Sequence, residues 1–370
     1  MNPFSKLLSM FSGGQNSDGS SDRIVGVDIG TSSIKLVELR KKGGKAVLET
    51  YSTLSLGPYA SMGVGATTNL PPDILTKAIA DAVREGNIAT KDAVFSIPSS
   101  ASLVFIVELP ATIEEKDLAS IVPTEARKYI PVPISEVTLD YWMIPHREDS
   151  FGQQAPKEPK IEVLVAAIHN ETLNKYRDLT NASGLTANTF EIEVFSAVRS
   201  TFSHELSAVL LMDFGASKTK LAIAEYGIIR NFHIVNRGSA QITTSISQSL
   251  SIPFEKAEEI KRKIGLLGEG ENAAVSDIAR MSVDFILSET ASVIQNFERK
   301  HNKAISKIIL SGAGALMPGF LDRAGATFKT ETAMGNPFDK VQVPEFVSKV
   351  LAETGPEFAI AVGLALRKLE

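Results

Sequence analysis

A short pattern occurs twice in the chain, and it constrains the fold more than any other feature of the sequence. The first copy is IVGVDIGTSSIKLV at residues 24–37, and the second is VLLMDFGASKTKLA at residues 209–222. In each copy an apolar run ends at an aspartate, crosses a glycine and a hydroxyl-bearing turn, and enters a second apolar run. This order predicts a strand, a tight turn and a returning strand. A chain with two such hairpins is expected to have two related halves around a central cleft.

The turn of each copy carries groups that bind anions. Gly30 and Gly215 let the backbone approach a ligand, and successive amide N–H groups with hydroxyls form a concave anion site. One D-x-G turn is weak evidence, but two copies facing each other predict a clamp on a polyphosphate. The expected hydroxyl donors are Ser32, Ser33, Ser217 and Thr219. Two lysines, Lys35 and Lys220, follow three residues after Ser32 and Ser217, where they either reach phosphates or are solvated strand lysines.

The aspartate that precedes each glycine is a candidate metal ligand. Mg²⁺ is usually held by few carboxylates together with waters and phosphate oxygens. Asp28 and Asp213, facing each other across a cleft, would suit that role through water. Alternatively, each aspartate caps its turn by hydrogen bonds to the backbone. Because the motif is repeated, the pair favours the phosphate and metal site.

Composition excludes several classes of function. The formal charge of −5 gives no electrostatic case for a nucleic-acid partner. The chain has no cysteine, so disulfides and zinc–thiolate sites are excluded, and its five histidines form no H-x-x-x-H pair. No apolar run reaches the ~18–20 residues that a membrane-spanning helix needs.

The start of the chain is amphipathic. Phe4, Leu7, Leu8 and Phe11 share one helical face, and a Gly/Ser-rich linker follows. Two interpretations stay open: residues 4–11 are a peripheral contact with a membrane or a partner, or they are a frayed terminus.

The order of predicted elements indicates an α/β fold with two lobes. Each half begins with strands and continues with helices, which are expected at 72–85, 239–250, 253–264 and 275–302. An α+β unit is inserted into the first half; in it Thr112 and Glu115 have capping-box spacing, Pro123 interrupts a helix, and Asn170 is expected to cap another. The expected divisions are a tail and linker at 1–22, a first subdomain at 23–98 plus 179–206, the insertion at 99–178, a second subdomain at 207–244 plus 303–370, and a helical subdomain at 245–302.

A third glycine cluster follows the predicted strand KIIL. It reads SGAGALMPG at residues 311–319, and it matches neither a Walker A loop nor the dinucleotide-binding fingerprint. Alone it is a plain strand–helix turn. Beside two phosphate-binding hairpins, its small residues predict the place where a base and ribose lie against the backbone.

This order of motifs resembles the actin-like ATPase superfamily, and the insertion narrows the resemblance. The segments LPATIEEKDL (109–118), EARKYIPVPISEVTLDYWMI (125–144), VLVAAIHNETLNKYRDLTNASGL (163–185) and EIEVFSAVRS (191–200) resemble the type IV pilus assembly protein PilM family, relatives of the cell-division protein FtsA. The resemblance covers residues 24–370. It implies a duplicated actin-like two-lobe ATPase fold with an α+β insertion subdomain in the first lobe, and a cytoplasmic protein associated with the inner membrane. It also implies ATP and Mg²⁺ as ligands, the N-terminal cytoplasmic peptide of a PilN-like membrane protein as partner, and pilus ATPases as further candidate partners.

The resemblance also assigns roles to residues. Gly30, Thr31, Ser32, Ser33 and Lys35 would belong to the first phosphate loop, and Gly215, Ser217 and Thr219 to the second, with Asp28 and Asp213 at the metal. Glu258 and Lys261, in AEEIKRKIG, would contact the nucleoside, and Gly312, Gly314 and Ala315 would border adenine and ribose.

Two departures from the family pattern bear on function. Glu193 stands where polymerising relatives have a water-positioning acid, but Val194 replaces their proline, so Glu193 is either a catalytic residue or a helix N-terminal carboxylate. Pro123 interrupts the insertion helix and would reshape a partner groove. The leading hypothesis is a nucleotide-loaded scaffold with weak or absent hydrolysis. The alternatives are a phosphotransferase of the same fold and a filament-forming protein.

Overall fold

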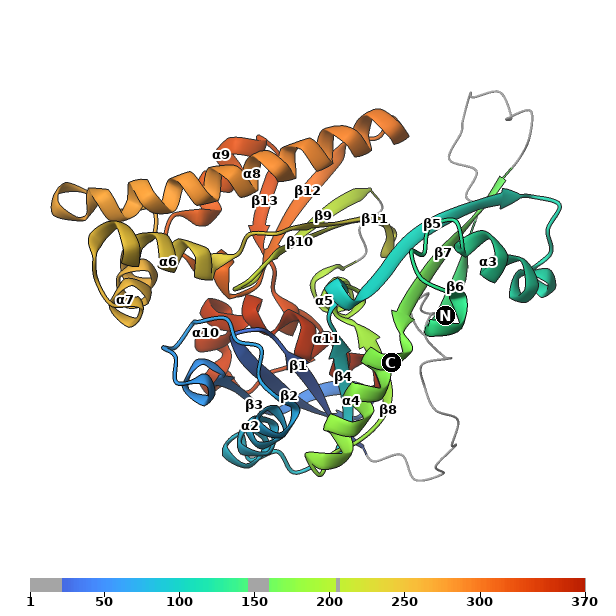
Figure 1. The fold of residues 1–370 in the computed structure, drawn as a ribbon, viewed down its shortest axis with the longest axis horizontal. Helices are drawn as coiled ribbons and strands as arrows, with labels where there is room; N and C mark the ends of the chain where they lie inside the picture. Colours follow the sequence, from blue (N-terminus) through green and yellow to red (C-terminus); the bar gives the residue numbers. More distant parts are fainter. Residues whose placement is uncertain (1–21, 146–159, 204–206, 370) are drawn as a thin grey trace.

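The computed structural model describes residues 22–145, 160–203 and 207–369, and these residues form three sheets. The first sheet has the order β14-β3-β2-β1-β4-β8. Its strands are β1 (Arg23–Ile29), β2 (Ser33–Lys42), β3 (Lys45–Ser55), β4 (Asp92–Ile97), β8 (Thr186–Ile192) and β14 (Val341–Gln342). Helices α2 (Pro72–Glu85) and α4 (Asn170–Ala182) pack together on one side of it, and α5 (Glu193–Thr201) and α11 (Ala359–Leu369) on the other (Figure 1).

The second sheet repeats the plan of the first. Its order is β11-β10-β9-β12-β13, formed by β9 (Ala208–Phe214), β10 (Thr219–Glu225), β11 (Ile228–Val235), β12 (Ile305–Ser311) and β13 (Glu331–Met334). In both sheets the central strand pairs antiparallel with its hairpin partner, β1 with β2 and β9 with β10. On its other edge it pairs parallel with a later strand, β4 or β12. The predicted duplication of two α/β lobes is therefore present.

Among the described residues, four helices complete the second lobe: α6 (Ser239–Leu250), α7 (Phe254–Ile264), α8 (Ala273–His301) and α9 (Phe320–Phe328). Helices α8 and α9 contact the second sheet, and α6 and α7 pack against α8. Because side chains alternate along a strand, β9 serves two cores. Leu210 and Met212 pack in the core beneath these helices, whereas Val209 and Leu211 belong to the core of the first lobe.

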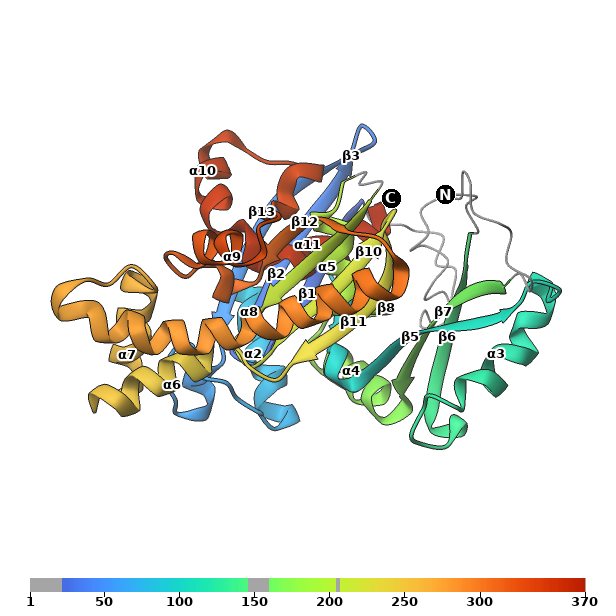
Figure 2. The ribbon, with the colours of Figure 1, turned by 90° about the horizontal axis from the view of Figure 1, so that it is seen from above.

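The insertion forms a third, antiparallel sheet of order β5-β7-β6. It consists of β5 (Ser102–Pro110), β6 (Val137–Ile144) and β7 (Lys160–His169), with α3 (Leu118–Ala126) on one face. Val163 and Val165 of β7 pack in the core with α3, and Leu164 and Ala166 pack in the core of the first lobe. Figure 2 shows this unit at the side of the molecule away from α6 and α7.

Two local predictions in the insertion are wrong. The capping box predicted at Thr112 is absent, because the chain first makes a turn and a 3₁₀ segment, and α3 begins at Leu118 without a side-chain cap. Asn170 is the first residue of α4 and not its cap. Its side chain accepts a hydrogen bond from Thr138 Oγ1 at 2.7 Å and donates one to the Ser135 carbonyl at 2.9 Å. The Asn170 side chain therefore ties α4 to the start of β6.

The C-terminal segment departs from the predicted division of the chain. Residues 303–370 are assigned by sequence to the second subdomain, but β14 pairs with β3 of the first sheet. Helix α11 packs against β1, β2 and α5, where Gly26 leaves room for the Ala361 carbonyl. Helix α10 (Glu345–Thr354) precedes it. The end of the chain therefore completes the first lobe.

Candidate functional site

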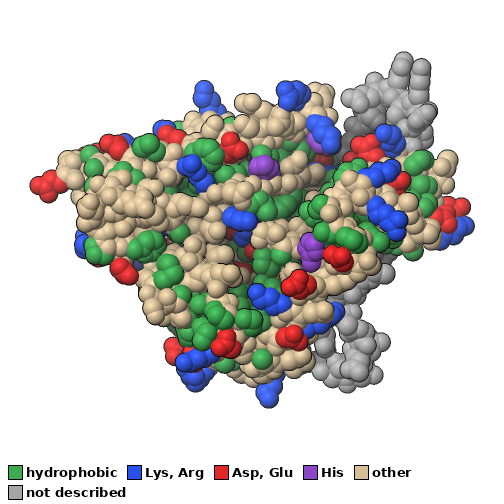
Figure 3. All heavy atoms as spheres, viewed as in Figure 1, with side chains coloured by type: hydrophobic (Ala, Val, Ile, Leu, Met, Phe, Trp, Pro, Cys, Tyr) green, Lys and Arg blue, Asp and Glu red, His purple; other side chains and the backbone are tan. Residues whose placement is uncertain are grey.

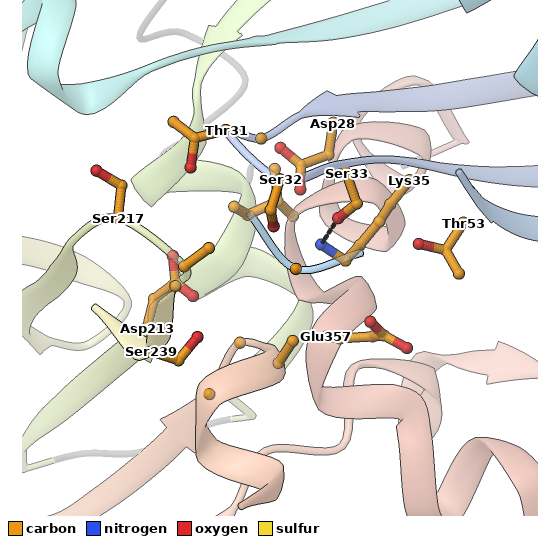
Figure 4. A pocket seen from close by; sticks show the side chains of 18 of the residues that line it. Asp28, Thr31, Ser32, Ser33, Lys35, Thr53, Asp213, Ser217, Ser239 and Glu357 are labelled. Carbon is orange, nitrogen blue, oxygen red and sulfur yellow. Dashed lines mark hydrogen bonds between the residues drawn. The ribbon is translucent and has the colours of Figure 1, made fainter. Parts of the chain in front are cut away.

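A cleft of about 560 Å³ opens between the two lobes, and both glycine hairpins face it. A cavity of this size is ordinary for a small-molecule ligand. In the close view of Figure 4, the residues of the first hairpin lie opposite Asp213 and Ser217 of the second. The predicted lining residues that border the cleft are Asp28, Gly30, Thr31, Ser32, Ser33, Lys35, Glu193, Asp213, Gly215, Ser217, Glu258, Lys261, Gly312 and Gly314.

The two hairpins have matching geometry. The amide of Gly30 donates to the Ser33 carbonyl at 3.0 Å, and the amide of Gly215 donates to the Lys218 carbonyl at 3.1 Å. In each hairpin the aspartate is the cross-strand partner of the lysine, Asp28 of Lys35 and Asp213 of Lys220. The repeat in sequence is therefore a repeat in three dimensions, with equivalent polar groups at both walls of the cleft.

Asp28, at the end of β1, is a buried carboxylate. Its Oδ1 accepts a hydrogen bond from Ser96 Oγ at 3.1 Å, and the Ser96 hydroxyl oxygen accepts one from the amide of Ile29 at 3.3 Å. Burial raises the pKa of Asp28 to about 6, because loss of water disfavours the charged form more than Lys35 favours it. The ionised form of Asp28 is therefore unfavourable in this buried position, and a cation bound beside the carboxylate would stabilise it.

Asp213 and Glu193 share the ammonium group of Lys220. Lys220 Nζ lies 3.0 Å from Asp213 Oδ2 and 2.8 Å from Glu193 Oε2. The other oxygen of Glu193 accepts a hydrogen bond from the amide of Ser99 at 2.8 Å. Burial alone would lower the pKa of Lys220, but the two carboxylates outweigh it and raise that pKa, so the ammonium stays charged. Both oxygens of Glu193 are therefore engaged.

Lys35 holds a different position on the other wall. Its Nζ donates to Ser33 Oγ at 3.1 Å, which is the dashed contact in Figure 4. Glu357 also borders the cleft, from the turn before α11, and burial raises the pKa of Glu357 while the nearby Lys35 opposes that shift. The ammonium of Lys35 therefore lies beside the turn of the first hairpin, and it forms no salt bridge with a carboxylate of the described residues.

The third glycine cluster brings bare backbone to the cleft. Gly312 has φ of +84°, and a Cβ there would lie 2.5 Å from Asp213 Oδ1 and 2.6 Å from the Phe214 carbonyl oxygen. A Cβ on Gly314 would lie 2.7 Å from the Phe214 ring. Only glycine fits these positions, because both the backbone angle and the space exclude a side chain at Gly312.

Helix α7 supplies a buried ion-pair cluster. Lys261 Nζ lies 2.7 Å from Glu258 Oε2, and that oxygen also accepts a hydrogen bond from Thr243 Oγ1 at 2.5 Å. Burial works to raise the pKa of Glu258, but Lys261 and the hydrogen bonds outweigh it and lower that pKa. Gly65, in the loop between β3 and α2, approaches Glu258 so closely that a Cβ would lie 2.7 Å from its carboxyl carbon. The first lobe therefore touches α7 across the cleft.

Two predicted site residues lie outside the lining. Thr219 is fully buried, and its hydroxyl donates to the Arg237 carbonyl at 2.8 Å. Ala315 is 3% exposed and packs in the core of the second lobe. Thr219 is the first residue of β10, and successive side chains of a strand point to opposite faces of the sheet. Ala315 lies within the 3₁₀ turn that follows Gly312. Neither side chain is placed to touch a ligand in the cleft.

Several lining residues were not predicted. They are Thr53, Ser55, Val64, Pro98, Ser100, Ser239, Arg262, Leu316, Met317, Thr354 and Glu357, among others. For one of them, Ser239, the sequence does contain an indication. Gly238 and Ser239 are two small residues between a strand and the start of α6, a pattern typical of a turn that approaches a ligand. The amide of Ser239 donates to the Gly215 carbonyl at 2.9 Å, which fixes the helix start against the second hairpin turn.

The oxygen-rich lining suits a hard cation only in part. Within residues 22–145, 160–203 and 207–369, no group of three or more His, Asp or Glu side chains is arranged to hold a metal ion. Asp28 and Asp213 offer carboxylate oxygens to the cleft, and a cation held there would need phosphate and water oxygens to complete its shell. The donor set fits Mg²⁺ bound together with a polyphosphate.

Solved structures of other proteins share the fold. The PilM–PilN type IV pilus biogenesis complex matches with a TM-score of 0.78 and 24% identity, covering 94% of this chain and 98% of that chain. The ethanolamine utilization protein EutJ of Carboxydothermus hydrogenoformans matches with a TM-score of 0.54 and 17% identity, over 95% and 91% of the two chains. MreB5 of Spiroplasma citri, solved with ADP, matches with a TM-score of 0.50 and 10% identity, over 93% and 95%. The fold is the duplicated actin-like one with an insertion in the first lobe.

Comparison of the sequence with those of known proteins gives related results. The cell-division protein FtsA of Pseudomonas aeruginosa is 23% identical over 380 residues, covering 91% of this chain and 88% of FtsA. FtsA of Bacillus subtilis is 20% identical over 373 residues, covering 90% and 82%. The model of the family described as type IV pilus assembly protein PilM matches residues 26–369. The chain belongs to the PilM family.

Proposed function

We propose that the chain binds ATP with Mg²⁺ between its lobes and serves as a scaffold of a type IV pilus assembly platform. The observation that carries this proposal is the pair of matched hairpins, whose glycines, serines and Lys35 all line one cleft. Gly312 and Gly314 line the same cleft, packed closely against Phe214, and a flat base would lie beside this turn. A protein of the same fold, MreB5, was solved with ADP, which supports a nucleotide as the ligand.

The chain's own groups would bind the phosphates from both sides. The turn amides and the hydroxyls of Ser32, Ser33 and Ser217 would donate to phosphate oxygens, and Lys35 would offset their charge. Asp28 and Asp213 would hold Mg²⁺, which supplies positive charge between the phosphates and these carboxylates. A nucleotide so held touches both lobes, and it fixes their relative angle only to the extent that it binds one arrangement better than another.

The contacts of Glu193 favour a protein that binds the nucleotide without hydrolysing it. A general base needs an oxygen within reach of the attacking water. One oxygen of Glu193 accepts from the Ser99 amide and the other contacts Lys220, so neither is available without breaking a buried contact. We therefore propose a nucleotide-loaded scaffold with weak or absent turnover.

Titration calorimetry with ATP and Mg²⁺ tests the nucleotide site. We expect binding to the wild type and a loss of about tenfold or more in affinity for Asp213→Asn, since a charged contact contributes ~1.5–3 kcal/mol. Asp277→Asn, which removes an exposed carboxylate of α8, is the control. Absence of binding to the wild type, or equal affinity in both variants, would sink the proposal.

The second part of the proposal is the partner, the N-terminal cytoplasmic peptide of a PilN-like inner-membrane protein. A PilM–PilN complex has the same fold with nearly complete coverage. The insertion presents an aromatic pair, with the rings of Phe105 and Tyr129 stacked at 4.8 Å and Tyr129 51% exposed. Exposed aromatic residues are frequent anchors in peptide recognition. Lys, Arg, Asp and Glu side chains are interspersed on the face shown in Figure 3, which does not favour a nucleic-acid partner.

Such a partner would place the chain in the cytoplasm at the inner membrane. Among the described residues, no helix combines the length and apolarity needed to cross a bilayer. The amphipathic residues 4–11 lie outside the described residues, and their membrane contact stays a prediction. Deleting residues 1–20 should release the protein from anionic liposomes if that contact exists, and unchanged binding would reject it.

Fluorescence anisotropy with a labelled N-terminal peptide of the PilN-like protein tests the partner. We expect Tyr129→Ala to weaken binding at least about fivefold, as truncation of an interface aromatic costs ~1 kcal/mol or more. Phe346→Ala is a matched control, because Phe346 is 84% exposed on α10 outside the insertion. No binding by the wild type would reject the peptide as partner, and equal effects of the two variants would reject the insertion as its site.

A further inference from the structure

One carboxylate of the cleft, that of Glu357, is not used by the proposed phosphate and metal contacts. It belongs to the 3₁₀ turn Gly355–Phe358, directly before α11, and it borders the cleft. Among the described residues, its side chain forms no hydrogen bond and no ion pair. Burial raises the pKa of Glu357, and the positive charges of Lys35 and Arg262 oppose that shift. A carboxylate that has lost part of its water without gaining a protein donor is a candidate contact for a ligand.

Glu357 lies between the two ends of the cleft that a nucleotide would occupy. On one side, the carbonyl of the preceding residue, Pro356, accepts a hydrogen bond from the amide of Gly312 at 3.0 Å, so the turn is fixed to the third glycine cluster. On the other side, the same turn packs against β2, the strand that carries Lys35. Figure 4 shows Glu357 on the side of Lys35, with Asp213 of the second lobe on the opposite side of the view.

The order of groups in a nucleotide fits this order of contacts. The base would lie beside the Gly312 turn and the phosphates beside Lys35, and the ribose joins the two. An ionised glutamate only accepts hydrogen bonds, so Glu357 suits the ribose hydroxyls, which donate, and not the phosphate oxygens, which accept. Carboxylates bind ribose hydroxyls in the same way in dinucleotide-binding folds. The position and the chemistry of Glu357 therefore both point to the ribose.

The carboxylate that the family pattern assigns to the nucleoside, Glu258, is already occupied. Its Oε2 lies 2.7 Å from Lys261 Nζ and accepts a further hydrogen bond from Thr243 Oγ1. Its Oε1 accepts a hydrogen bond from Arg262 Nε at 2.7 Å. A ribose hydroxyl would have to compete with these contacts at Glu258, whereas no such contact of the described residues holds the oxygens of Glu357.

We propose that Glu357 accepts hydrogen bonds from the ribose hydroxyls of the bound nucleotide and makes the cleft selective for ribonucleotides. The inference rests on the proposed function, because it needs ATP in the cleft. A site that hydrogen-bonds a hydroxyl discriminates against the analogue that lacks it, because the polar group of the site is then left without a partner. Hydrogen bonds to a charged group correspond to a preference of about tenfold or more.

Calorimetry with ATP, 2′,3′-dideoxy-ATP and ITP, each with Mg²⁺, tests the assignment. Dideoxy-ATP keeps the base and the triphosphate but has no ribose hydroxyls, and ITP keeps the ribose and the triphosphate but carries oxygen in place of the amino group of the base. We expect the wild type to bind dideoxy-ATP about tenfold or more weakly than ATP. Glu357→Ala should bind the two within about twofold of each other, and Glu357→Gln should lie between, because its amide oxygen still accepts a neutral hydrogen bond.

Two controls separate this effect from damage to the fold. Glu357→Ala also removes a negative charge near the triphosphate, so its affinity for dideoxy-ATP should not fall below that of the wild type. If Glu357→Ala loses affinity for both ligands through misfolding, the ratio in Glu357→Gln decides. Glu353→Ala removes an exposed carboxylate of α10, four residues earlier in the chain, and should keep the full wild-type ratio.

Each other outcome has a separate meaning. If the wild type binds ATP and dideoxy-ATP equally well, or if Glu357→Ala keeps the wild-type ratio, the assignment is overturned while the nucleotide site stands. It is also overturned if Glu258→Gln loses the preference and Glu357→Ala does not. A change confined to the ratio of ATP to ITP in Glu357→Ala overturns it as well, because the carboxylate would then contact the base. If the wild type binds none of the three nucleotides, the proposed function fails and this inference with it.

Discussion

We predict that the buried charge of Asp28 lowers the stability of the free protein and strengthens binding of nucleotide with Mg²⁺. The substitution Asp28→Asn separates these two effects. The substitution keeps an oxygen that can accept the hydrogen bond from Ser96 and removes a charge that is 4% exposed. In the absence of nucleotide and Mg²⁺, the variant should therefore be more stable at neutral pH. With nucleotide and Mg²⁺, it should bind more weakly, because the carboxylate is the group that favours the cation.

The magnitude follows from the pKa of Asp28, which burial raises from 3.8 to about 6. An acid with a raised pKa binds more protons in the folded state than in the unfolded state between those two values, so its ionisation lowers stability as the pH rises through that window. A shift of about two units corresponds to about 3 kcal/mol above pH 6. The advantage of the variant should grow from about 1.5 kcal/mol at pH 5 to about 3 kcal/mol at pH 7.

Urea unfolding of both proteins between pH 5 and pH 8 measures this difference. Asp277→Asn, an exposed carboxylate on α8, controls for the loss of one negative charge. The reasoning is refuted if Asp28→Asn is less stable than the wild type at pH 7, or if the difference between them does not increase with pH.

Two further substitutions probe the cleft and the core beneath it. Gly312→Ala should lower the free energy of unfolding by about 2–4 kcal/mol, because a Cβ at φ +84° would also overlap Asp213. Gly44→Ala, at φ +77° with open space around it, should cost only the backbone strain, and equal losses in urea unfolding would contradict the steric account. Arg199→Met should cost about 3 kcal/mol, the lower end for a broken buried ion pair, since Glu191 loses its two 2.6 Å contacts but keeps Arg367 at 3.3 Å; a loss below 1 kcal/mol by the same assay would refute this.

The sequence predicted the hairpins well because their signals are local. Alternating apolar residues, a glycine turn and a returning strand define residues 23–55 and 208–235 without reference to the rest of the chain. The repeated positions then allowed one copy to support the other, so that Asp28 and Asp213 could be placed on opposite walls of the same cleft.

Features that depend on tertiary contacts were not predictable in this way. All nine residues of α5 are buried, including Glu193, Ser196 and Arg199, although polar residues at this spacing normally indicate a solvent-exposed helix face. Strand β14 has two residues and is defined only by its pairing with β3. The contact of Lys220 with Glu193 joins residues 27 positions apart, and no spacing rule predicts it.

The return of the chain's end to the first lobe has a consequence for synthesis. Strand β14 and helix α11 complete the first sheet, and α11 packs against the strand with which the described chain begins. A ribosome delivers residues in order, and domains normally fold as they emerge. Here the first lobe lacks its last strand and the helix α11, whose residues Ala359–Leu366 are all buried, until residues 341–369 have been released. While the insertion and the second lobe are being synthesised, the first sheet exposes the apolar face that α11 covers in the folded protein. We therefore expect the first lobe to be the part of the nascent chain that is most prone to aggregation.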